Sequence, residues 1–196
     1  MRHGVGLTTA LVLWAAGGCA TIPHPTDDRD TLVIVSLQLA PGDGHDAEAQ
    51  APAPPGVVLV FKNVSRGGEF EVVTSKAGYA WFPCAGGDSY ALVGYHYQIR
   101  EPSGDLYTLS GRIGAVFDTG PDQVCYLGHY VVHEALLDTT GPLGEDADAP
   151  GADPGPGSVS RTEDAAGMVR FLREAERNSA WLSCEAVTPV LREWEQ

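Results

Sequence analysis

Cys19 is the residue whose type and setting carry the most chemical information in this chain. It follows a basic start at residues 1–3 and an apolar run at residues 11–18 that ends in two glycines. A basic start, an apolar stretch and small residues before a cleavage point describe a secretory signal. The run is too short and too broken by glycine for a good spanning helix, which needs about 20 apolar residues. The sequence therefore predicts export of the chain.

The segment around Cys19 also resembles the lipobox of bacterial lipoproteins, in which a cysteine directly follows small residues. In that family a peptidase cuts before the cysteine, and lipid is attached to its sulfur. The resemblance implies that residues 1–18 are removed and that Cys19 carries the lipid. Ala20 stands where an Asp would resemble an inner-membrane retention signal, so the outer membrane is implied. Ala16 stands where the family usually has Leu, which leaves an ordinary signal peptide or an uncleaved anchor as alternatives.

Three further cysteines, Cys84, Cys125 and Cys184, form no Cys-x-x-Cys pair, which excludes a zinc knuckle and a thioredoxin-like motif. A disulfide is permitted beyond the inner membrane. Cys125 lies within a strand pattern and should be a small buried hydrophobe. Any bridge is therefore predicted to join Cys84, which follows a proline in a turn, to Cys184, which lies in a tail that must be held against the domain. It would close a loop of about 100 residues, for which the chain-entropy model gives about 4–5 kcal/mol.

Other reactive side chains do not assemble into a catalytic or metal-binding motif. His129 and His133 have the spacing of a helical metal pair, but a strand would hold them about 13 Å apart. Glu69 and Glu71 alternate on one predicted strand, which favours a solvated face over a glycosidase pair. No nucleophile elbow is present, and neither a metal, a cofactor nor catalysis is predicted. A set of aromatic residues offers the best source of a binding surface, although core packing explains most of it: Tyr79, Trp81, Tyr95, Tyr97, Tyr107, Tyr126 and Tyr130.

The charge of the chain excludes some partners. The formal net charge is −14, and such a surface repels phosphate backbones, so nucleic-acid binding is not expected. The same charge discourages adsorption to anionic lipid, which makes the acyl anchor the expected membrane contact. The acidity itself is explained by solubility.

The elements that position these residues are mainly strands. Seven segments between residues 31 and 134 have strand patterns and are joined mostly by short turns, which indicates an antiparallel β-sandwich. In the first of them, Val33, Val35, Leu37 and Leu39 share one face. Residues 40–56 are rich in Pro, Ala, Gly and acids and are predicted to be a long solvated loop.

Around this domain, at residues 31–135, the sequence predicts several flanking segments. Residues 19–30 are predicted to be a polar tether, and residues 141–157 an extended acidic linker. Residues 160–163 have the spacing of a capping box, which predicts a helix over 162–178. Ala165, Met168, Val169, Leu172 and Ala175 would line its apolar face. Because three turns are marginal alone, we expect the helix of the 160–196 region to dock on the sandwich.

The hairpin at residues 79–92 and the last strand, at residues 125–132, carry a second resemblance. The hairpin resembles the strand, Pro-Gly turn and Tyr-x-Leu of transthyretin-like and carboxypeptidase-regulatory-like sandwiches, although Ala85 and Gly86 lengthen the usual tight turn. The last strand is similar to the closing strand of many uncharacterised bacterial lipoproteins, in which Tyr-x-Gly follows a turn that contains Pro. This resemblance implies a transthyretin/Ig-like fold that serves as a binding or structural module without catalysis.

The sequence as a whole predicts a lipid-anchored module of the cell envelope that faces the periplasm or the surface and contacts another envelope protein. An accessory lipoprotein of a secretion or envelope-assembly machine is the alternative. An envelope enzyme ranks third.

Overall fold

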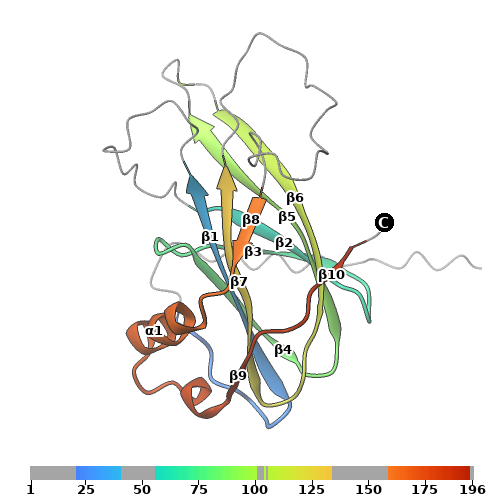
Figure 1. Cartoon of the computed structure of the whole chain (residues 1–196), viewed down its shortest axis with the longest axis vertical. Helices are drawn as coiled ribbons and strands as arrows, with labels where there is room; N and C mark the ends of the chain where they lie inside the picture. The colour runs from blue at the N-terminus through green and yellow to red at the C-terminus, as the bar shows by residue number, and fades with distance from the viewer. Residues whose placement is uncertain (1–20, 41–55, 101–103, 105, 134–158, 195–196) are drawn as a thin grey trace, which may run out of the picture.

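Two β-sheets lying face to face form the body of the protein (Figure 1). The computed structural model describes residues 21–40, 56–100, 104, 106–133 and 159–194. Sheet A has the strand order β4-β1-β7-β8, with β9 also paired to β7, and sheet B has the order β10-β6-β5-β2-β3. The strands are β1 (Asp30–Ala40), β2 (Val58–Asn63), β3 (Glu69–Val73), β4 (Tyr79–Ala85), β5 (Ser89–Arg100), β6 (Leu106–Asp118), β7 (Gln123–His133), β8 (Val159–Thr162), β9 (Glu185–Val187) and β10 (Arg192–Glu193).

The sequence predicted the mainly β architecture, and the seven expected segments correspond to β1–β7. The predicted strand number and the purely antiparallel character were wrong. The described residues form ten strands, and β7 pairs in parallel with both β1 and β9. A parallel pair needs a long connection, and here the strands β2–β6 provide it between β1 and β7 without a crossover helix.

Sheet A is buried on both of its faces. The inner face, toward sheet B, carries Val33, Val35 and Leu37 of β1, as the alternation predicted. The outer face carries Leu32 and Ile34, and it is covered by α1 (Ala165–Ala175) and the 3₁₀ helix η1 (Ala180–Ser183). The side chains that those helices bury there are Met168, Phe171, Leu172 and Trp181. The predicted docking of a C-terminal helix is therefore confirmed (Figure 1).

The start of α1 differs from the predicted capping box. Residues 159–162 instead form β8, which pairs with the end of β7, so the chain turns into the helix only afterwards. Asp164 is the N-cap, and its carboxylate accepts a hydrogen bond from the Gly167 amide at 2.8 Å. Phe171, which the predicted apolar face omitted, stacks on Tyr79 with ring centroids 4.2 Å apart. Ala175, which that face included, is exposed.

The segment predicted to be a polar tether is docked where the structure describes it. Ile22 is 2% exposed and belongs to the outer core. The Trp181 indole N–H donates a hydrogen bond to the Pro23 carbonyl at 2.6 Å, and His24 lies 3.3 Å from the Glu176 carboxylate. An apolar residue and a buried indole donor thus hold this segment against the helices. The predicted signal peptide at 1–18, Cys19, the body of the 40–56 loop and the 141–157 linker lie outside the described residues.

Candidate functional site

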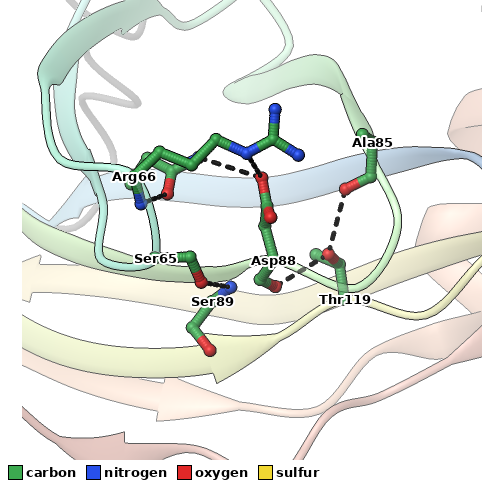
Figure 2. Close-up of polar contacts among 7 residues, drawn as sticks. Ser65, Arg66, Ala85, Asp88, Ser89 and Thr119 are labelled. Carbon is green, nitrogen blue, oxygen red and sulfur yellow. Dashed lines mark hydrogen bonds and ion pairs between the residues drawn. The ribbon is translucent and has the colours of Figure 1, made fainter.

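Polar side chains are concentrated where the β2–β3, β4–β5 and β6–β7 turns meet, a region called the turn end here. Figure 2 shows Asp88 at its centre. The Asp88 carboxylate accepts from Arg66 Nε at 2.8 Å and from Asn63 Nδ2 at 3.2 Å. The Thr119 hydroxyl donates to the Asp88 backbone carbonyl at 2.9 Å. Because these contacts link three turns, the network fixes one end of the two sheets.

A second ion pair strengthens the turn end. Arg192 of β10 donates from Nη2 to both Asp118 oxygens, at 2.8 and 2.9 Å, and the Ser89 hydroxyl donates to Asp118 at 2.5 Å. The Ser89 amide also donates to Ser65 Oγ at 2.8 Å (Figure 2). The carboxylates and hydroxyls of this region therefore already have partners within the protein, and the arrangement is suited to holding turns together.

The three described cysteines are free thiols, so the predicted Cys84–Cys184 bridge is absent from the structure. Cys84 packs on the inner core between the sheets, whereas Cys184 packs on the outer core under the helices. Sheet A therefore separates them. Cys84 and Cys125 share the inner face, but they lie opposite Thr31 and Val33 on the two sides of β1. Two strand spacings are about 10 Å, beyond the roughly 7 Å that a disulfide spans between Cα atoms.

The environment of each thiol favours its protonated form. Burial raises the pKa of Cys84 to about 12, against the smaller opposing effect of hydrogen bonds with Tyr90 and Thr119. Burial also raises the pKa of Cys125 to about 12, and Cys125 is fully buried, as predicted. Burial and the neighbouring Asp122 carboxylate raise the pKa of Cys184 to about 11. Since the thiolate is the nucleophilic form, these cysteines are poorly suited to nucleophilic catalysis at neutral pH.

The two histidines of β7 form hydrogen bonds with different serine residues. Gly128, at φ +108°, lies where the β1–β7 register shifts and inserts an extra residue into β7. The bulge places His129 Nδ1 at 2.8 Å from the Ser36 hydroxyl. His133 Nε2 lies 3.4 Å from the Ser160 hydroxyl. No group of three or more metal-ligating side chains occurs among the described residues.

The remaining candidate residues also have structural or solvent-exposed positions. Glu69 and Glu71 are exposed on β3, as predicted, and Glu71 lies 3.2 Å from His96 Nε2. The aromatic set is mostly core: Tyr95, Tyr97, Tyr126 and Tyr130 are buried, and Tyr79 and Trp81 pack under Phe171. The side chain of Tyr107 lies outside the described residues.

The sequence analysis missed one surface feature, the exposed side of α1. Arg170 and Arg173 of α1, together with Arg177 just beyond the C-cap residue Glu176, line a shallow depression there with Val169 and Leu182; we call this the arginine face. Part of the signal was present in the sequence, because Arg170 and Arg173, three residues apart, share one side of a helix. None of the three forms an ion pair within the described part of the chain. This face can bind anions.

Comparison with known proteins found no matching family model, no matching curated protein and no matching solved structure. Within the described segments, no helix has the length and apolar character needed to cross a membrane.

Proposed function

We propose that this protein is a lipid-anchored binding or structural module of the bacterial cell envelope, with a transthyretin-like sandwich that contacts another envelope protein. The anchor is Cys19, and the outer membrane is the proposed location. The secretory pattern and lipobox resemblance before Cys19 support export and lipidation. Two sheets packed face to face support the sandwich.

One observation favours a binding module over an enzyme. Three of the described candidates for chemistry are engaged in contacts that hold the fold together: Asp88 with Arg66, His129 with Ser36, and the thiols in apolar surroundings. The arginines of the arginine face, in contrast, have no ion-pair partner among the described residues and point to a surface interaction.

The anchor is tested by replacing the proposed lipid-bearing sulfur. Cys19→Ser should prevent acylation, which mass spectrometry of the N-terminal peptide detects. It should also move the protein out of the outer-membrane fraction. Cys184→Ser is the matched control, because it removes a thiol without touching the leader. An unacylated wild-type Cys19, or equal outer-membrane recovery of the two variants, contradicts the proposed anchor.

The partner is tested by cross-linking the wild-type lipoprotein in its native envelope and identifying the captured protein. The module is supported if the same envelope protein is cross-linked in repeated experiments and is no longer captured by a variant with an altered surface. Turnover of an envelope substrate by the purified chain would contradict it.

A further inference from the structure

The arginine face has an unusual charge for this chain. It gathers three arginines, from a total of twelve Lys and Arg residues, on a protein with a net charge of −14. One carboxylate, Glu174, lines the same depression. All three arginines are exposed, while the opposite side of α1 is buried against sheet A. The helix is therefore amphipathic, with a cationic outer side.

The positive charges of this face lie close together. Arg170 and Arg173 are three residues apart on α1, where like charges repel one another, and Arg177 follows the C-cap residue Glu176. Among the described residues, Arg66, Arg161 and Arg192 each have an acidic partner within 4 Å, whereas the arginines of this face have none. The repulsion between neighbouring cations is relieved when an anionic surface lies against them. Guanidinium groups suit phosphate in particular, because their donors form paired hydrogen bonds with its oxygens.

The position of the chain's N-terminal segment indicates which anionic surface is near. Ile22 is locked in the outer core, Pro23 accepts the Trp181 hydrogen bond, and His24 contacts Glu176, the neighbour of Arg177 in sequence. Cys19 precedes Ile22 by three residues, which span at most about 11 Å in any conformation. An acyl group on Cys19 would therefore enter the membrane close to the helix side of the domain.

We propose that the arginine face binds the phosphate groups of anionic phospholipid at the membrane surface and holds the α1 side of the domain against the bilayer. The location of this contact rests on the proposed lipidation of Cys19. The acidic remainder of the surface is repelled by the same lipids, so the two effects together orient the domain. Val169, half-buried, and Leu182, 36% exposed, add apolar contact within the depression.

The test uses the full chain carrying Cys19→Ser, so that binding does not depend on acylation. Its affinity is measured for vesicles of phosphatidylcholine alone and for vesicles in which part of that lipid is replaced by phosphatidylglycerol. The readout is the ratio of the two affinities, because a contribution from the apolar leader is shared by all variants. We expect a ratio well above one at low salt, which falls as salt screens the charges.

Arg173→Gln should lower this ratio about five-fold, the effect of one basic residue at an anionic surface. Lys76→Gln, which removes an exposed charge from the β3–β4 turn, is the matched control and should leave the ratio unchanged. The triple variant Arg170→Gln, Arg173→Gln, Arg177→Gln should bring it to one or below. The corresponding triple lysine variant keeps the charges and should retain most of the binding.

Two results would overturn the proposal. One is a ratio that is the same for the starting protein and the triple glutamine variant. The other is binding of an acidic peptide such as polyglutamate without any preference for anionic vesicles, which would make the face a protein-docking surface. Neither result bears on acylation, because these proteins lack the Cys19 thiol. Failure of the lipid anchor is detected separately, by mass spectrometry of wild-type Cys19.

Discussion

The turn end and the α1 side use arginine in opposite ways. At the turn end, Arg66 and Arg192 each meet a carboxylate at 2.8 Å, and the resulting pairs connect segments that are far apart in sequence. On the α1 side, three arginines face solvent without an ion pair among the described residues. The difference indicates that the first region contributes to stability, whereas the second is available for a partner. The two regions should therefore respond differently to mutation.

The largest expected effect concerns Trp181, which joins the N-terminal segment to the α1 side. Its side chain is 1% exposed, and its indole N–H donates to Pro23. Trp181→Ala should lower the free energy of unfolding by about 3–5 kcal/mol, because it leaves a large cavity. Urea denaturation measures this loss. Leu182→Ala, at the exposed neighbouring position, should change the stability by less than about 0.5 kcal/mol.

Hydrogen exchange of the same variant sharpens the comparison. If Trp181 fastens the helix side specifically, amides of α1 should exchange faster in Trp181→Ala, while β5 and β6 in sheet B stay protected. Equal loss of protection in both regions would show that the outer core is not a separate stabilising unit.

The outer core also shows how far the sequence could predict this structure. The alternation of side chains along β1 predicted that Val33 and Val35 face one core, because successive side chains of a strand point to opposite faces. The docking of α1 was predicted from its apolar face, but the parts that Ile22 and Trp181 play in the second core were not, since these residues come from opposite ends of the chain. Their contacts leave no periodic signal. The β7 bulge at Gly128 escaped prediction for a related reason, because a register shift depends on the partner strand.

The candidate site residues also differ in whether a local sequence pattern could predict them. The strand pattern around Cys125 correctly predicted burial, but pairing of Cys84 with Cys184 required knowing which side of sheet A each thiol faces. The arginine spacing on α1 was readable from the sequence, yet only the buried opposite side of the helix shows that these side chains face outward. The Asp88 network joins three turns that are separated in sequence, so no local sequence pattern predicts it.

At the turn end, Asp88→Ala should cost about 2 kcal/mol of unfolding free energy. The change removes the acceptor of Arg66 and Asn63, and hydrogen bonds to charged groups contribute about 1.5–3 kcal/mol. Urea denaturation at neutral pH measures the loss. Glu69→Ala is the control, since this carboxylate is exposed on β3 and has no described ion-pair partner. Similar losses in both variants would contradict the structural role of the network.

Alkaline pH should weaken the inner core through its thiols. Burial raises the pKa of Cys125 from 9.0 to about 12 in the folded chain, so above pH 9 the unfolded chain loses this proton first. The contribution is therefore fully present below pH 9 and is lost as the pH rises toward 12. At pH 10 the loss should be about 1.4 kcal/mol for one thiol. Denaturation of the wild type and Cys125→Val between pH 7 and 10 checks this, and the variant should show the shallower decline.

The smallest expected effect is on the α1 side, and its size separates the two regions. Arg173→Gln removes a cation that repels Arg170 but that also interacts favourably with the helix dipole in the last turn of α1, so the unfolding free energy should change by less than about 0.5 kcal/mol. Raising the salt concentration should reduce any difference, because exposed charges are screened. Thermal unfolding at low and high salt provides the measurement. A loss above about 1 kcal/mol would mean that Arg173 holds the helix in place, and the contrast with the turn end would fail. An unchanged or higher stability, together with weaker binding to anionic vesicles, would show that this arginine is retained for contact with a partner surface.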